Sequence, residues 1–130
     1  MKLTKKQKKI NAKERHMKTK AYAKKQLKKQ DKEKDKEWRN QVMKRYKGKC
    51  VLCGNSKNPN AHHIISRTFK ETRWDPRNGI ILCPKHHKFS KFSAHKNALW
   101  FITLLIDCEP QKYKYLVTKL GELLKHENNI

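Results

Sequence analysis

Apolar residues are sparse and irregular over the first thirty positions of the chain. Lys, Gln and Ala fill most of this stretch and favour helix, but no side of such a helix would be apolar enough to bury. We therefore expect an arm that is helical only in part, or only when it is bound to a partner. Its scattered apolar residues are Leu3, Ile10, Met17, Tyr22 and Leu27.

A regular apolar stripe begins at Trp38. Trp38, Val42 and Tyr46 follow one another at four-residue spacing, which predicts a helix over about residues 33–46 with one side on a core. Gly48 then supplies a helix stop. The change in pattern divides the chain into a lysine-rich, partly helical arm over residues 1–37 and a domain over residues 38–130.

Two short apolar runs in the middle of the chain predict strands. The pair Ile64 and Ile65 fits a first short strand, and residues 80–82 fit a second one. Between them, residues 75–79 (Asp-Pro-Arg-Asn-Gly) are typical of a turn. A helix is expected to begin near His86.

The last third of the chain predicts two packing helices. Residues 98–106 are apolar on nearly every side, and apolar residues repeat at helical spacing over residues 115–124. The aromatic residues Trp74, Trp100 and Phe101 are expected in the core. The predicted fold class is therefore α+β, a small two-stranded hairpin with helices packed around it.

Charge points to a polyanionic partner. Thirty-four Lys and Arg residues stand against eleven Asp and Glu, so the formal net charge is +23 at pH 7. Repulsion among these charges opposes a compact state unless an anionic partner neutralises them. A solvated tail is the alternative for the lysine run.

No apolar run approaches the roughly 18–20 residues of a membrane span, and no secretion signal follows Met1, so we expect a cytoplasmic protein.

The cysteine spacing predicts a metal site. Cys50-x-x-Cys53 and Cys83-x-x-His86 present four ligands in the paired spacing that a tetrahedral structural zinc ion needs. Cys108 stands apart after an apolar run and is expected to be a small buried hydrophobe.

The segment between the two metal-binding pairs is rich in histidine. It contains His62 and His63 ahead of two isoleucines, then Asn78 followed by Gly79, and His87 comes directly after the second pair. This order resembles the HNH endonuclease family in its zinc-bracketed branch. The departure from that branch is His86 in place of a fourth cysteine, which leaves His87 as a competitor for zinc.

The resemblance implies a ββα-metal site and phosphodiester hydrolysis in DNA. His63 would be the general base that activates water, and Asn78 would orient its loop. His62 and His87 would hold a catalytic divalent metal, Mg²⁺, Mn²⁺ or Ni²⁺. Because neighbours on a strand point to opposite faces, His62 and His63 would need a bulge or twist to serve one site.

The resemblance also implies partners and products. One active site per chain would nick one strand, a monomer is favoured, and small nucleases of this kind are frequently encoded by phages. The loop between the strands carries four cations that we expect to bind the DNA backbone. They are Arg67, Lys70, Arg73 and Arg77.

Some alternatives remain open at this point. His95 lies just ahead of an apolar helix, where helix entry explains its polarity and a supporting or DNA-contacting role is a further option. A zinc-stapled nucleic-acid-binding protein without catalysis would keep the cysteines and the basic arm. An RNA-binding assembly factor would explain the charge equally well.

Overall fold

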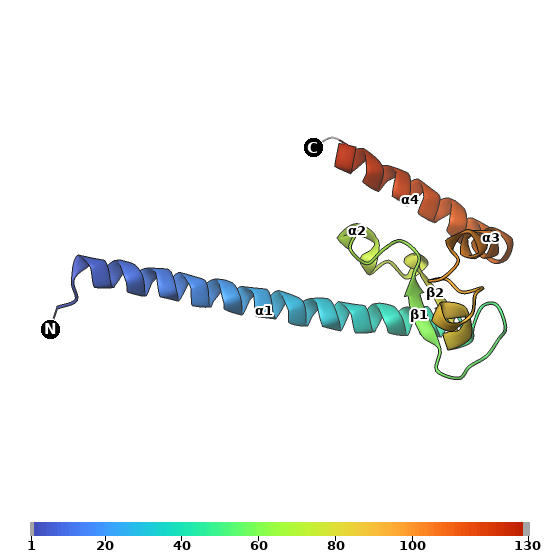
Figure 1. Cartoon of the computed structure of the whole chain (residues 1–130), viewed down its shortest axis with the longest axis horizontal. Helices are drawn as coiled ribbons and strands as arrows, with labels where there is room; N and C mark the ends of the chain where they lie inside the picture. Colours follow the sequence, from blue (N-terminus) through green and yellow to red (C-terminus); the bar gives the residue numbers. More distant parts are fainter. Residues whose placement is uncertain (1, 129–130) are drawn as a thin grey trace. The chain divides into compact units, whose positions relative to one another are not determined.

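A computed structural model describes residues 2–128 of the chain. Its contacts divide the chain into two compact units, Met1–Lys34 and Asp35–Ile130. The elements follow in the order shown by the colours of Figure 1. They are α1 (Lys5–Arg45), β1 (Asn60–His63), α2 (Lys70–Arg73), the 3₁₀ turn η1 (Pro76–Asn78), β2 (Gly79–Leu82), the π-helical turn η2 (Lys85–Phe89), α3 (Ala98–Cys108) and α4 (Pro110–Asn128).

The basic arm is helical from Lys5 onward, which is more continuous helix than the expected partial one. α1 runs without a break over 41 residues (Figure 1), because its sequence contains neither Gly nor Pro and consists mostly of strong helix formers. Thr4 caps the first turn by accepting a hydrogen bond from the Gln7 amide at 3.2 Å. At the other end, the Gly48 amide bonds to the Met43 carbonyl at 2.9 Å with Gly48 at φ +65°. The stop predicted at Gly48 is confirmed.

The two strands form one antiparallel hairpin. Asn60 pairs with Leu82 and His63 with Gly79, in a regular register. The first strand therefore ends before Ile64 and Ile65, where we had expected it, because the chain bends at these residues. Ile65 instead packs beside Leu116 and Leu123 of α4.

Asn78 fixes the loop that joins the strands. Its side chain is fully buried, accepts a hydrogen bond from the Ile65 amide at 2.6 Å and donates to the Ile65 carbonyl at 3.0 Å and the Thr72 carbonyl at 3.1 Å. Three bonds from one amide group tie the end of β1 and the end of α2 to the start of β2. This part of the structure is therefore rigid just beyond the His62 and His63 pair.

The C-terminal end of α1 packs on the hairpin, as its apolar stripe predicts. Trp38 and Val42 are buried and form a cluster with Ile81 of β2. The Trp38 indole donates to the Asp75 carbonyl at 2.9 Å, and Asp35 receives hydrogen bonds from Arg73. These bonds hold the pKa of Asp35 below its usual range.

Gly79 offers a test of this packing. A β-carbon at Gly79 would meet the side chains of Val42 and Trp38, the latter at 2.8 Å. We expect Gly79→Ala to destabilise the domain by about 1–3 kcal/mol through overpacking. Gly121, inside α4, has nothing within 4 Å of such a carbon, so Gly121→Ala should be stabilising by about 0.5–1 kcal/mol. Urea unfolding followed by tryptophan fluorescence measures the free energy of unfolding of both variants. Equal shifts of the two urea midpoints in the same direction would contradict the close packing at Gly79.

The two C-terminal helices confirm the predicted packing helices and extend them. Phe101, Leu104 and Leu105 of α3 are buried with Ile80 and Leu82 of the hairpin. Cys108, however, is exposed, because it is the last residue of α3 and lies outside this cluster. Its expected burial was wrong. Among the helices of residues 2–128, none combines the length and apolarity that crossing a membrane requires.

α4 also contributes a buried cation to the hairpin. Lys112 donates through Nζ to the Gly79 carbonyl at 2.7 Å and to the Arg77 carbonyl at 3.3 Å. Burial lowers the pKa of Lys112 to about 8. Nothing in the apolar pattern of the sequence marks this lysine as different from its many neighbours, so sequence analysis missed it.

Candidate metal centres and active site

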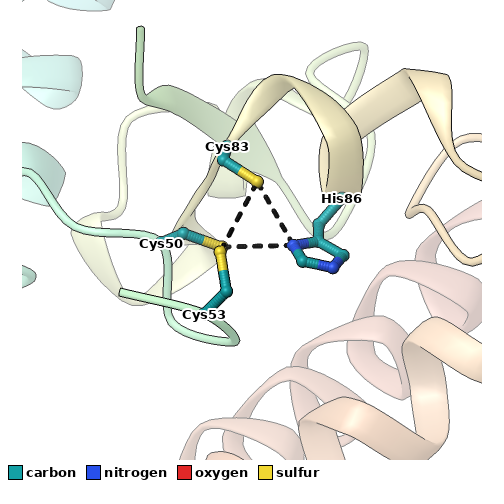
Figure 2. A group of neighbouring side chains, drawn as sticks. All are labelled: Cys50, Cys53, Cys83 and His86. Atoms are coloured by element: carbon teal, nitrogen blue, oxygen red, sulfur yellow. Dashed lines mark hydrogen bonds between the residues drawn. The ribbon is translucent and has the colours of Figure 1, made fainter. Parts of the chain in front are cut away.

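The first candidate centre joins the two metal-binding pairs. Figure 2 shows the side chains of Cys50, Cys53, Cys83 and His86 converging on one point, with donor atoms that all lie within 4.8 Å of one another. The Cys53 and Cys83 sulfurs are 3.8 Å apart, and His86 Nδ1 lies 3.7 Å from the Cys50 sulfur and 3.2 Å from the Cys83 sulfur. A zinc tetrahedron with ordinary bond lengths has edges of about 3.6–3.8 Å. The donor set and its dimensions therefore fit zinc.

Backbone hydrogen bonds shape both pairs. Gly54 adopts φ +71° and its amide bonds to the Cys50 carbonyl at 2.9 Å, which turns the chain back after Cys53. The His87 amide bonds to the Cys83 carbonyl at 2.8 Å and starts the second turn. That turn, η2, begins at Lys85, so the helix expected near His86 is present as a single π-helical turn, which an irregular loop follows. Burial, with Lys85 beside it, lowers the pKa of His86 and favours the neutral ring that binds metal.

The second candidate centre consists of three imidazole rings. His62 at the end of β1, His87 in η2 and His95 in the following loop present nitrogens that all lie within 4.8 Å of one another. The His87 and His95 Nε2 atoms are 3.1 Å apart. Burial, with His87 and His95 nearby, lowers the pKa of His62 to about 3, and burial with His95 nearby lowers that of His87 to about 4. The His62 and His87 rings are therefore neutral at pH 7 and can coordinate a cation.

His95 is the residue of this group that the sequence left unassigned. Its amide bonds to the His87 carbonyl at 3.2 Å, and the preceding Ala94 amide bonds to the His86 carbonyl at 2.8 Å. These two bonds lay the loop alongside η2 and bring the His95 ring to His87. The available signal was weak, since it consisted only of a third histidine eight residues after His87.

His63 has a different environment from its neighbour. Its ring stacks on Trp38 at 3.7 Å between centroids with an interplanar angle of 7°. Its Nε2 lies 2.8 Å from the Arg73 carbonyl oxygen. Because a carbonyl oxygen only accepts, this contact assigns the proton to Nε2 and leaves a lone pair on Nδ1. Burial lowers the pKa of His63, so the ring is unprotonated near neutral pH.

The two neighbouring histidines reach one cleft without a bulge. His62 meets the edge of Phe101 on one face of the hairpin, whereas His63 stacks on Trp38 on the other. The regular register contains no bulge between the strands, so of the two distortions that we expected, a bulge or a twist, the bulge is absent from the hairpin. Both residues lie at the end of β1 and line a cleft of about 480 Å³, which is also lined by His87, His95, Arg67 and Lys88.

Three of the four cations expected to bind DNA pair with carboxylates in this structure. Arg67 and Arg73 bind Asp35, at 3.1 and 2.6 Å, and Arg77 binds Asp75 at 3.0 Å. The Arg73 side chain is only 14% exposed, whereas those of Arg67 and Arg77 are mostly exposed and remain accessible to a phosphate. Lys70 is exposed at the start of α2, and among the four expected cations Arg67 lines the cleft.

Comparison with known proteins identifies the central segment. Residues 50–93 match the family model described as HNH endonuclease, which covers about a third of the chain. The matched segment includes both metal-binding pairs and His62, His63, Asn78 and His87, and it ends two residues before His95. No curated protein and no solved structure matches the chain. Over residues 50–93 the chain therefore carries a domain of the HNH endonuclease family.

Proposed function

We propose that this chain is a metal-dependent DNA endonuclease that hydrolyses one phosphodiester bond at a time and so nicks a single strand. The family match indicates nuclease activity and a nucleic-acid substrate in general. The observation that carries the more specific proposal is the cleft, because His63, with an available Nδ1, lines it together with the imidazoles of His62, His87 and His95.

His63 is the proposed general base. Its Nδ1 takes a proton from water while the water oxygen bonds to phosphorus and the bond to the 3′ oxygen breaks, which leaves a 5′-phosphate and a 3′-hydroxyl after that oxygen gains a proton from solvent. The Trp38 stack and the Arg73 carbonyl hold the ring in one orientation and one tautomer. Asn78 contributes by fixing the backbone two residues beyond His63.

His62, His87 and His95 would hold the catalytic divalent cation. Bound there, the cation would offset negative charge on the phosphate and on the leaving oxygen. Imidazole ligands suit Mn²⁺, Ni²⁺ or Zn²⁺ better than Mg²⁺, so we expect the first two to support faster cleavage. Arg67 and Lys88, which line the cleft, would hold the phosphate oxygens on either side.

Cys50, Cys53, Cys83 and His86 would hold a structural zinc ion that fastens the hairpin to η2. The fit rests on the tetrahedral spacing of the four donor atoms and on the small hydrophobic core around them. The zinc would take no part in the reaction and would act only on folding.

The experiment that tests the proposal is conversion of supercoiled plasmid to the open-circular form. Metal should be removed from the second site by dialysis and restored as Mg²⁺, Mn²⁺ or Ni²⁺, because a strong chelator would also attack the cysteine site and unfold the domain. We expect nicking only with added metal. Binding of plasmid without nicking under all metals would favour a zinc-stapled DNA-binding protein, and cleavage of an RNA of matched length alone would favour an RNA substrate.

α1 is proposed to grip the DNA backbone through its lysines. Residues 1–31 contain 13 Lys and Arg and 2 acidic residues, a net charge of +11. We expect deletion of residues 1–31 to weaken DNA binding and to flatten its salt dependence, since each phosphate contact contributes roughly 0.9 to the log–log slope. Cleavage by the shortened protein should persist at low salt.

The matched control keeps the helix and removes its charge. A full-length variant with its thirteen arm cations changed to Gln should bind as weakly as the deletion, with the same reduced slope. Binding curves at several salt concentrations, measured by fluorescence anisotropy, compare the three proteins. If deletion leaves affinity and slope unchanged, the arm is a passive tail.

A further inference from the structure

Two phenylalanines are exposed to solvent just after the cleft residue Lys88, Phe89 at the end of η2 and Phe92 in the loop that follows. Phe89 is 74% exposed and Phe92 is 59% exposed, whereas Phe69 is partly buried and Phe101 is buried. Single exposed apolar residues are ordinary on protein surfaces. Here, however, the two exposed members of the chain's four phenylalanines occur three residues apart and directly after Lys88, which lines the cleft.

The charge around these rings favours an anionic ligand. No Asp or Glu occurs from residue 76 to residue 106, and the loop interleaves its aromatic residues with lysines. The cations of this segment are Arg77, Lys85, Lys88, Lys91 and Lys96. An apolar protein surface would gain no binding energy from these positive charges. A nucleic-acid strand offers both phosphates for the lysines and base faces for the rings.

The loop is held in place rather than loose. The Ser90 amide bonds to the Lys85 carbonyl at 2.9 Å, the Phe92 amide to the Ser90 hydroxyl at 3.1 Å, and Lys96 Nζ to the Phe89 carbonyl at 3.3 Å. Phe92 also contacts the Trp100 ring at 6.2 Å between centroids. An anchored backbone presents the Phe89 ring at low entropic cost on binding.

We propose that Phe89, supported by Phe92, stacks on unpaired or locally unstacked bases of the DNA strand whose phosphate occupies the histidine cleft. Phe89 is one residue from Lys88 and two from His87, so its Cα lies within about 8 Å of the Cα of His87, a proposed metal ligand. This distance corresponds to about two to three nucleotides along a DNA strand. The inference rests on the proposed function for the place of the strand. It adds a substrate preference for single-stranded or locally opened DNA near the cut.

The test measures binding rather than cleavage. Zinc-loaded full-length protein is titrated, without added catalytic metal, into a labelled oligothymidylate and into a blunt duplex of equal length. We expect Phe89→Ala to lower affinity for the single strand by roughly 5- to 150-fold, with a smaller loss on the duplex and an unchanged salt slope, because stacking is removed and no charge is lost. Phe89→Trp should restore the affinity.

The matched control is Leu124→Ala in α4, which removes another exposed apolar side chain, 58% exposed, and should change neither affinity. Unchanged single-strand affinity in Phe89→Ala, or an equal loss on single strand and duplex, would overturn the inference. Zinc content and tryptophan fluorescence confirm that each variant is folded. A wild-type protein that binds in this Phe89-dependent way but never nicks plasmid would refute the proposed nuclease function alone.

Discussion

Replacing Cys50 with Ser is expected to abolish zinc binding and to unfold the domain over residues 35–128. Cys50 is buried in the main core cluster, and its sulfur is 3.7 Å from His86 Nδ1, so the change removes one of the four proposed zinc ligands and leaves a buried hydroxyl. Structural zinc contributes about 10–16 kcal/mol of binding free energy in small domains at neutral pH, which exceeds the stability that most domains of this size possess. The loss should therefore be nearly complete.

The measurement must separate this domain from the part of α1 that precedes it, residues 5–34, because that helix would dominate a far-ultraviolet signal. Trp38, Trp74 and Trp100 all lie in the second unit, so tryptophan fluorescence reports on it alone. Zinc is counted by elemental analysis. Cys108→Ser is the matched control, because Cys108 is exposed and lies outside the cluster, and it should keep one zinc and cooperative unfolding. A Cys50→Ser protein that unfolds cooperatively at the wild-type midpoint would refute the structural role of zinc.

The features that could be predicted from the sequence are those that short-range residue spacing determines. The stripe formed by Trp38, Val42 and Tyr46 predicted the packed end of α1, and the C-x-x-C and C-x-x-H spacings predicted the four donors that converge in Figure 2. Both patterns depend on residues three or four positions apart, within one turn of backbone.

The sequence did not predict features that depend on tertiary contacts. The His95 ring lies beside His62 and His87 because backbone hydrogen bonds hold its loop along η2, and no residue pattern in the sequence indicates these bonds. The continuous α1 was missed for another reason. Its residues lack an apolar face, and we weighted that absence above the helix propensity of an uninterrupted run without Gly or Pro.

The expected bulge between His62 and His63 failed on geometry. We assumed that one site requires both rings on one face of the strand, but His62 and His63 both line the cleft although their rings lie on opposite faces of the hairpin. The opposite orientations of the His62 and His63 rings allow each ring to have different neighbours. One ring faces its metal-binding partners and the other faces Trp38, which supplies a rigid surface of its own.

His63→Ala is expected to lower the nicking rate by about 10²–10⁴-fold while DNA affinity and zinc content stay near wild type, because a general base is lost and the charges that bind DNA remain. The substitution also removes the stack on Trp38, so His63→Phe is the sharper variant, since it keeps an aromatic ring there and has no nitrogen to accept a proton. Both should be equally inactive. His126→Ala, an exposed histidine in α4, serves as the control and should cleave normally.

A metal titration separates the base from the metal ligands. Excess Mn²⁺ should partly restore nicking by His87→Ala and His95→Ala, because each of these variants keeps two of the three imidazoles and loses only metal affinity. The same excess should leave His63→Phe inactive, because no added cation replaces the Nδ1 lone pair that the Arg73 carbonyl orients. Parental nicking rates in His63→Phe would remove His63 from the mechanism, and recovery of His63→Phe at high Mn²⁺ would identify it as a metal ligand instead.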